Sequence, residues 1–455
     1  MPPLSLDDTS GRLPERILAA MEREIREGRW KPGMKLPPQR QMALSLKVSL
    51  GAVTAAYAHA EARGLVRGEV GRGTFVRGSA DLASPSGPFD LAHNIAPTHI
   101  AGPRLSQALL RLARQDTLAD CAAYPEPAGA PGQRRAVAAW IARTTLLPDS
   151  VQDLAVRLIC VNGAQQGCAV ALAAILRPGE RLIVESPTFT GVRVLAAHMG
   201  YPLTGLALDA EGASPDSLEA AASTGARVAY LQPLHNPTGR VMGLARRQAL
   251  VEVARRRDLY LVEDDLYGAY ASELTLPPLA ALAPERVFYV GGLSKSLAPG
   301  LRFGYCLPPN EDRFRQGVLT ALRAIAFGPP GISGRIAQDW LESGTADEIL
   351  AEHLASFTQR TELALKWLGA RVERPRHRAA TQVWAPMSQM DAERVAAQAG
   401  RLGVMITPPS PSQTGERTSG LRLCLGGAAS LSALEEALRR TAAAFAGREI
   451  ALDAV

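Results

Sequence analysis

The sequence lacks the features that mark membrane, secreted and metal-binding proteins. Its apolar runs, such as residues 168–176, are well short of the roughly 18 residues that a spanning helix needs. The N-terminus has neither a basic start followed by an apolar stretch nor a small-residue cleavage site, so we expect no export signal and a cytoplasmic location. The five cysteines lie far apart, without a C-x-x-C pair or a histidine cluster. We therefore expect no disulfide framework, no metal site and no membrane span.

What is present is a long chain with an uneven charge. At roughly 100 to 200 residues per domain, 455 residues predict two to four domains. Residues 1–80 hold 13 basic and 8 acidic side chains, a net charge of +5, whereas the whole chain carries +6. A small basic module joined to a nearly neutral body indicates that the module binds a polyanion, although a solvated charged surface is the alternative reading.

The basic module has the pattern of three short helices and a hairpin. Apolar residues at helical spacing predict a helix over residues 13–25. Residues 31–46 and 48–63 predict two short helices joined by a tight turn, the first opened by prolines. Residues 64–76 alternate apolar and polar side chains around glycines and predict a hairpin with Arg72 at its tip. Together these elements predict a winged helix-turn-helix.

This module resembles the winged helix-turn-helix of the GntR family of bacterial transcription regulators. The resemblance rests on Leu36-Pro-Pro-Gln-Arg40, Val48-Ser49, Ala56-Tyr57, Gly64-Leu65 and Gly71-Arg-Gly-Thr-Phe-Val76. It implies that Arg40, Ser49, Thr54 and Arg72 contact double-stranded operator DNA. Members of the family usually carry an arginine where this chain has Leu50. A helical module used only for dimerisation is the alternative.

The rest of the chain has the pattern of an α/β protein. We assign the DNA-binding domain to residues 1–78 and a linker rich in Gly, Ser and Pro to residues 79–92. Residues 93–455 alternate short β-rich runs with longer helical stretches, which predicts a large, mostly parallel mixed sheet followed by a smaller C-terminal α/β domain. We place the large part at about residues 130–335 and the small part at about residues 336–455.

Five β-rich runs of this body each end in a cluster of polar and glycine residues. Because ligands bind outside the carboxyl ends of strands in an open α/β sheet, these clusters are expected to line one pocket. The clusters begin at Asn162, Glu185, Gln232, Glu263 and Gly291.

The chemistry of the clusters fits a ligand with a phosphate, an electron-poor ring and an aldehyde. The glycine turn over residues 163–167 opens a helix, whose free N–H groups and dipole attract phosphate. Either Asp264 or Asp265 can hold the protonated nitrogen of a pyridine ring. Lys295 at a strand end is a candidate for a Schiff base, and Arg302 can add a charged contact to the phosphate.

The ordered set resembles the fold-type I pyridoxal-phosphate (PLP) enzymes of the aspartate aminotransferase group, from about residue 93 to residue 455. The resemblance implies that Lys295 binds PLP covalently and that Asp264 is the partner of the pyridine nitrogen. It further implies that Asn236 and Tyr267 form hydrogen bonds to the phenolic oxygen and that the ring of Phe189 stacks on the cofactor.

The remaining matches concern phosphate and carboxylate groups. The resemblance implies phosphate contacts from Ala164, Gln165 and Arg302. Tyr124 matches the tyrosine with which a partner subunit reaches the phosphate, which implies a homodimer. Arg422 matches the arginine that binds a substrate carboxylate through its bidentate fork.

Two positions depart from the pattern of these enzymes. Gly292 stands three residues before the lysine, where Ser or Thr is usual, and Phe189 stands where Tyr is often found. The first change removes one phosphate hydroxyl and the second removes a phenol. We expect cofactor binding to survive both changes with lower affinity; a degenerate α/β domain that has lost its cofactor is the alternative.

A GntR-like module fused to an aminotransferase-like body resembles the MocR subfamily of bacterial regulators over the whole chain. The resemblance implies a PLP-dependent transcription regulator in which an amine or amino acid effector exchanges with Lys295. Two other functions stay open. One is an active aminotransferase that converts an amino acid to a 2-oxo acid and carries an attached DNA-binding module, and the other is a DNA-binding protein independent of small molecules.

Overall fold

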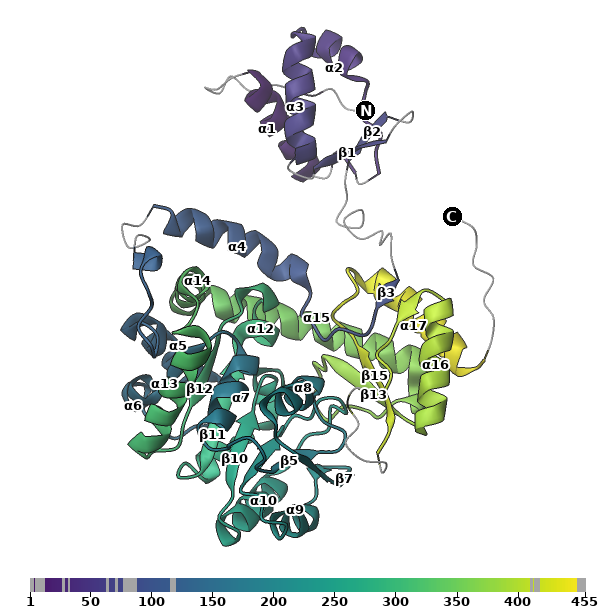
Figure 1. Ribbon diagram of the computed structural model, residues 1–455. Coiled ribbons are helices and arrows are strands. Elements are labelled where there is room, and N and C mark those ends of the chain that lie inside the picture. Colours follow the sequence, from purple (N-terminus) through teal and green to yellow (C-terminus); the bar gives the residue numbers. More distant parts are fainter. Residues whose placement is uncertain are drawn as a thin grey trace. The chain divides into compact units, whose positions relative to one another are not determined.

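A computed structural model describes residues 4, 13–26, 29–31, 33–62, 65–69, 73–76, 88–114, 120–409, 412 and 418–447. The chain divides into two compact units, residues 1–87 and 88–455. Figure 1 shows the elements of each unit. Among the helices of the described ranges, none combines the length and the apolar character that crossing a membrane requires.

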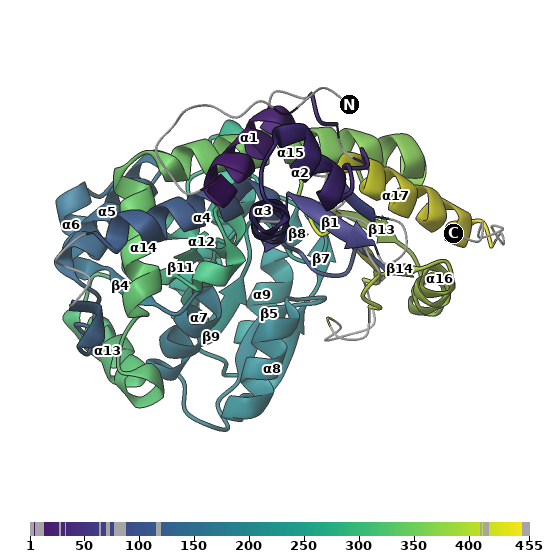
Figure 2. The same ribbon diagram turned by 90° about the horizontal axis from the view of Figure 1, so that it is seen from above.

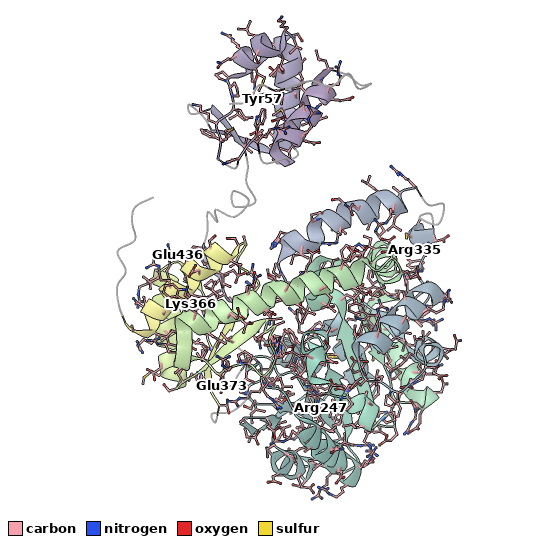
Figure 3. All side chains as sticks on the ribbon, turned by 180° about the vertical axis from the view of Figure 1, so that it is seen from behind. Tyr57, Arg247, Arg335, Lys366, Glu373 and Glu436 are labelled. Carbon is pink, nitrogen blue, oxygen red and sulfur yellow. The ribbon has the colours of Figure 1, made fainter. Side chains whose placement is uncertain are left out.

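The first unit is the predicted winged helix-turn-helix. Its elements are α1 (Leu13–Arg26), α2 (Gln39–Leu46), α3 (Leu50–Ala62) and the antiparallel strands β1 (Val66–Glu69) and β2 (Gly73–Val76). Its core gathers around Ile17, Met21, Trp30 and Val53. The buried Tyr57 of α3 donates a hydrogen bond to the carbonyl oxygen of Pro37 at 2.9 Å, which ties α3 to the segment before α2 (Figure 3).

The second unit is built on a seven-stranded sheet. The sheet is parallel except for β12, which runs antiparallel to both of its neighbours. Side chains on both faces of the sheet are buried, because βαβ connections place helices on both faces. In spatial order the strands are β4 (Ile159–Val161), β12 (Gly304–Leu307), β11 (Val287–Gly292), β10 (Tyr260–Asp264), β9 (Val228–Leu231), β5 (Leu182–Glu185) and β6 (Leu203–Leu206).

Two layers of helices cover this sheet. The core on one face includes residues of α7 (Ala164–Ala173), α8 (Thr190–Met199) and α13 (Asp312–Ala326). The core on the other face includes residues of α4 (Thr98–Leu112), α5 (Pro131–Thr144), α6 (Val151–Arg157), α9 (Pro215–Ala222), α10 (Leu244–Arg256), α11 (Leu279–Leu282) and α14 (Gly331–Glu342). Short elements complete this part: β7 (Leu208–Asp209), β8 (Gly212–Ala213), α12 (Leu293–Ser296), η3 (Gly268–Leu274) and η4 (Pro299–Leu301).

The C-terminal part forms a second, smaller core. Its elements are η5 (Gly369–Arg371), β13 (Gln382–Pro386), α16 (Gln389–Arg401), β14 (Val404–Met405), β15 (Gly420–Cys424) and α17 (Leu431–Phe445). The long helix α15 (Thr345–Leu368) contacts α4, α12 and α14 as well as β13 and α17, so it joins the two parts (Figure 2). The mostly parallel sheet with a smaller C-terminal α/β part is the fold class that the sequence predicts.

One segment lies where the sequence pattern predicts only a connector. Phe89 and Asp90 form β3, which pairs in parallel with β14, and Leu91 is buried in the C-terminal core. The backbone N–H of Leu91 donates to the carbonyl oxygen of Met405 at 3.0 Å. A two-residue strand is too short to show periodicity, so the sequence alone places it inside the linker.

Candidate functional site

A cavity of about 350 Å³ opens at the carboxyl ends of the central strands. Residues after β5, β9, β10 and β11 line it, together with residues of the C-terminal part and of the segment after β3. The lining residues that carry chemistry are Phe189, Gln232, Asn236, Asp264, Tyr267, Lys295 and Arg422. The sequence-predicted convergence thus brings residues from four of the five clusters to one cavity.

Asp264 is the buried carboxyl group of this cavity. Its Oδ2 atom accepts hydrogen bonds from the hydroxyl of Tyr230 at 2.5 Å and from Nε2 of Gln232 at 3.2 Å. Its Oδ1 atom is buried and has no hydrogen-bond partner among the described residues. Burial raises the pKa of Asp264 from 3.8 to about 6. Because an unpaired buried carboxylate oxygen is unfavourable, Oδ1 is suited to a bound donor that carries positive charge.

Asp265, the other candidate carboxylate, has a different hydrogen-bond partner and lies outside this cavity. Its Oδ2 atom accepts a hydrogen bond from the hydroxyl of Tyr289 at 2.9 Å, and its side chain does not line the 350 Å³ cavity. Of the two carboxylates, Asp264 is therefore the one that lines the cavity.

Lys295 lies on α12, directly after β11, and donates a hydrogen bond to the backbone carbonyl oxygen of Asn94. Burial lowers the pKa of its ammonium group from 10.5 to about 8, and the positive charges of Arg422 and Arg302 act in the same direction. A lysine with this pKa loses its proton far more easily than a surface lysine, and the neutral amine is the nucleophilic form.

Arg422 projects from β15 toward the same cavity. Its Nη1 atom donates to Oδ1 of Asn236 at 2.9 Å and its Nη2 atom donates to the carbonyl oxygen of Ala92 at 2.8 Å. Its Nε atom is buried without a hydrogen-bond partner among the described residues. The guanidinium is thus already oriented and keeps further N–H groups, among them the buried Nε–H, that can donate to a carboxylate ligand.

Two aromatic residues complete the walls. Phe189 precedes α8, and Tyr267 follows β10 and is buried. Burial raises the pKa of Tyr267 above its usual value of 10.0, so its hydroxyl keeps its proton and can donate a hydrogen bond.

The residues predicted to contact phosphate lie around the start of α7. Gly163 has φ 79° and precedes Ala164, and a Cβ atom at position 163 would lie 2.8 Å from Nη2 of Arg302. The guanidinium of Arg302 makes no hydrogen bond or ion pair with any residue that the structure describes. Gln165 instead donates to the carbonyl oxygen of Gly191 at 2.8 Å. A helix N-terminus beside an unpaired guanidinium attracts an anion.

Gly292 packs closely at this point, because a Cβ atom there would lie 3.3 Å from the carbonyl oxygen of Phe303. A Cβ atom at position 292 would lie 3.4 Å from the backbone nitrogen of Ala164, so a longer side chain there would lie at the start of α7. Glycine at this position supplies no hydroxyl group to a ligand at the start of α7.

Tyr124 lies outside the cavity of its own chain. Its side chain is 87% exposed, and its ring centroid lies 5.7 Å from that of Phe327, which is itself exposed. An exposed aromatic pair is unusual on the surface of an isolated chain and is typical of a contact between subunits.

In the N-terminal unit, the predicted DNA contacts lie on α2 and at the start of α3. Arg40 is exposed on α2, and Oγ of Ser49 accepts a hydrogen bond from the backbone N–H of Ala52 at 3.3 Å, which caps α3. The exposed Thr54 donates to Oε1 of Gln39 at 2.9 Å. Arg72 lies outside the described residues.

Four contacts were not foreseen from the sequence. Tyr230 and Gln232 hold Asp264, and the carbonyl oxygens of Ala92 and Asn94 accept from Arg422 and Lys295. Gln232 begins one of the strand-end clusters, so its position in the sequence indicated that it could lie at the cavity. Tyr230 lies inside a strand that is buried on both faces, and a backbone carbonyl has no side-chain signature.

The cysteines supply neither a disulfide nor a metal site among the described residues, although Sγ of Cys424 lies 3.4 Å from the carbonyl oxygen of Ala92. All five cysteines are free thiols, four of them buried. Within the described ranges, no three His, Cys, Asp or Glu side chains form a group that could hold a metal ion.

The chain is similar to two families of proteins. Residues 89–440 match the family of class I and II aminotransferases, and residues 13–76 match the gntR family of bacterial regulatory proteins. The HTH-type transcriptional regulator YdeF of Bacillus subtilis, described as uncharacterized, is 26% identical over 372 residues, which cover 80% of this chain and 79% of that protein. The vitamin B6 salvage pathway transcriptional repressor PtsJ of Salmonella typhimurium is 29% identical over 299 residues, 64% of this chain and 66% of that protein.

Solved structures share the fold of the body. An archaeal alanine:glyoxylate aminotransferase superposes with a TM-score of 0.72 at 24% identity, over 80% of this chain and 92% of that chain. Aspartate aminotransferase from Thermus thermophilus gives 0.66 at 22% identity, over 90% of this chain and 100% of that chain. The predicted fold class is confirmed. The chain belongs to the class I and II aminotransferase family and joins that body to a gntR-family winged helix-turn-helix, the arrangement of the MocR subfamily.

Proposed function

We propose that this chain is a DNA-binding transcription regulator whose body binds PLP and senses PLP or an amino compound. The observation that carries the proposal is one chain with both a winged helix-turn-helix and a cavity that pairs a buried, unpartnered Asp264 Oδ1 with a lysine of lowered pKa. The names of PtsJ, a repressor in vitamin B6 salvage, and of TauR, an HTH-type transcriptional regulator of Rhodobacter capsulatus that is 28% identical over 402 residues, 78% of this chain and 79% of that protein, support it.

The residues present fit this cofactor. PLP supplies an aldehyde, an electron-poor pyridine ring and a phosphate when bound. In the proposal, Lys295 binds the aldehyde carbon as a neutral amine, and Oδ1 of Asp264 holds the proton on the pyridine nitrogen. Asn236 and Tyr267 bind the phenolic oxygen, and Phe189 covers a face of the ring and excludes water from it.

The anionic groups have separate partners in the proposal. Ala164, Gln165 and Arg302 bind the phosphate, and Tyr124 reaches it from the partner subunit of a homodimer. Arg422 binds the carboxylate of an amino acid effector. Arg422 and Lys295 also donate hydrogen bonds to the backbone carbonyl oxygens of Ala92 and Asn94, so an effector competes with the backbone wherever it takes the same N–H groups.

Fluorescence anisotropy with labelled DNA from upstream of the chain's own gene tests the proposal. We expect the full-length protein to prefer this DNA to a scrambled sequence by about a hundredfold, a ratio that non-specific phosphate binding does not give. PLP and then single amino acids are added to the same titration, and at least one addition is expected to shift the affinity. Equal, weak and salt-sensitive binding to both sequences would contradict a regulator.

The second candidate is a working aminotransferase, favoured by the presence of Lys295, Asp264 and Arg422 in one cavity. Regulation and transamination share this chemistry, because a buried lysine can also move a proton. Turnover of amino acids with a 2-oxo acid acceptor distinguishes the two. Sustained turnover without sequence-specific DNA binding would favour the enzyme.

Replacing Tyr230 by phenylalanine is expected to weaken PLP binding about tenfold near pH 7, since hydrogen bonds to charged groups contribute roughly 1.5 to 3 kcal/mol. The Tyr230 hydroxyl lowers the pKa of Asp264, so its loss raises that pKa above about 6 and leaves more of the carboxyl group protonated. The deficit relative to the wild type should shrink as pH rises and Asp264 ionises. Equilibrium dialysis with PLP from about pH 6 to about pH 9 measures this.

Tyr201→Phe is the matched control for this change. Tyr201 is also buried, and its hydroxyl donates to the carbonyl oxygen of Leu176 at 3.4 Å, away from the cavity. It should leave PLP affinity unchanged. A deficit in Tyr230→Phe that is the same at every pH would show that the hydroxyl does not act through Asp264.

A further inference from the structure

The exposed side of α3 is apolar over its first nine residues. The residues that reach the surface there are Leu50, Gly51, Thr54, Ala55 and Ala58, which we call the α3 face. Leu50 is 43% exposed. A helix that is apolar on all sides is normally buried, so an exposed apolar side indicates a surface that a partner covers.

The hydrogen bonds around the α3 face leave mainly C–H groups for a partner. The hydroxyl proton of Thr54 is donated to Oε1 of Gln39, so the methyl group is the part of Thr54 left to contact a ligand. Oγ of Ser49 accepts from the backbone of Ala52 as the helix cap. Over the described part of α3, ionisable side chains are exposed only beyond the face, at His59 and Glu61.

Cationic residues lie near this face. The bond between Thr54 and Gln39 brings the start of α2 beside α3, and Arg40 is the next residue, with its side chain exposed. Lys47 is exposed in the turn between α2 and α3, and Lys35 is exposed next to the hairpin. An apolar strip with Arg40 and Lys47 near its start is complementary to an anionic partner that presents apolar groups inside a groove.

Double-stranded DNA has this chemistry. In its major groove the apolar group on the base edges is the 5-methyl group of thymine, and alanine, threonine methyl and other apolar side chains contact it. We propose that the α3 face recognises thymine methyl groups in the major groove of the operator. This inference rests on the proposed DNA-binding function and deepens it.

The test removes the methyl groups from the DNA and leaves its base pairs intact. The fragment from upstream of the chain's own gene is copied with either dTTP or dUTP, and the affinity of the full-length protein for each copy is measured by anisotropy. At roughly 0.8 kcal/mol per buried methyl group, each lost contact weakens binding about fourfold, so two or more contacts give tenfold or more. We expect the uracil copy to bind at least tenfold more weakly.

Two variants assign the effect to α3. In the variant Leu50→Ala the ratio of the affinities for the thymine copy and the uracil copy should fall toward one. In Leu44→Ala the ratio of the two affinities should stay as in the wild type. Leu44 is 79% exposed, but it lies five residues from Gln39, the residue of α2 that contacts Thr54, and therefore points about 140° away from that side of α2. The comparison of the two copies with the wild-type protein needs no variant and stands even if Leu50→Ala folds poorly.

The outcomes separate this inference from the proposed function. Equal affinity for both copies, with both preferred to scrambled DNA, would overturn the inference and keep the regulator. A loss on the uracil copy that is equally large in Leu50→Ala would remove Leu50 from the recognition and overturn its role. Absence of any preference over scrambled DNA would overturn the proposed function and this inference with it.

Discussion

Lys295→Ala is expected to abolish covalent attachment of PLP. The chain contains only five lysines, and Lys295 and Lys366 are the two in residues 88–455. Burial lowers the pKa of Lys295 to about 8, so its amine reacts at neutral pH, whereas an exposed lysine remains an ammonium ion. The wild-type protein, incubated with PLP and reduced with borohydride, should gain the mass of one phosphopyridoxyl group on the peptide that holds residue 295.

The chain offers a matched control for this experiment. Lys366 on α15 is exposed and forms an ion pair with Glu435 at 3.2 Å, so Lys366→Ala should keep the mass gain (Figure 3). A stoichiometric mass gain in Lys295→Ala would contradict the assignment, because no other lysine lies among the described residues that line the cavity.

Asp264→Asn is expected to act in opposite directions on stability and on cofactor affinity. Burial raises the pKa of Asp264 from 3.8 to about 6, so the folded protein binds this proton more tightly than the unfolded chain does. Stability therefore falls as pH rises from about 4 to about 6, and above that range the ionised carboxylate costs on the order of 3 kcal/mol. Asparagine avoids this cost, because its amide oxygen can still accept from Tyr230 and Gln232.

The cofactor-free variant should therefore melt at a higher temperature than the wild type near pH 8, and the gain should vanish near pH 4. At the same time PLP should bind roughly tenfold to a hundredfold more weakly, because an amide cannot neutralise a protonated pyridine nitrogen. Thermal melts and dialysis on one preparation measure both effects.

Asp258→Asn serves as control, since Asp258 is 76% exposed and its φ of 50° suits asparagine. A cofactor-free Asp264→Asn that is less stable than the wild type near pH 8 would contradict the electrostatic cost.

The sequence predicts those parts of the site that depend on side chains at strand ends. Asp264, Lys295 and Asn236 follow apolar runs, and the carboxyl ends of parallel strands meet at one edge, so their convergence follows from topology. The fold class follows from the same alternation. Resemblance to a known family then selects Asp264 over Asp265, a choice that residue types alone leave open.

Other features depend on three-dimensional packing and have no local pattern. From the sequence, Tyr230 looks like any other residue of the core, because all residues of β9 are buried. The sequence of β9 does not show that the hydroxyl of Tyr230 donates a hydrogen bond to Asp264. The pairing of β3 with β14 joins residues more than 300 positions apart through two-residue strands. Long-range contacts of this kind leave no periodic signal.

Ala92 and Asn94 connect the cavity to the start of the second unit. Both residues lie within seven positions of Gly87, where the N-terminal unit ends, and their carbonyl oxygens are held by Arg422 and Lys295. A ligand that binds these two cations competes with the chain's own backbone for them. A ligand that takes both cations removes two of the hydrogen bonds that hold residues 92–94 against the C-terminal part, whereas the pairing of β3 with β14 and the hydrogen bond from Leu91 to Met405 stay in place.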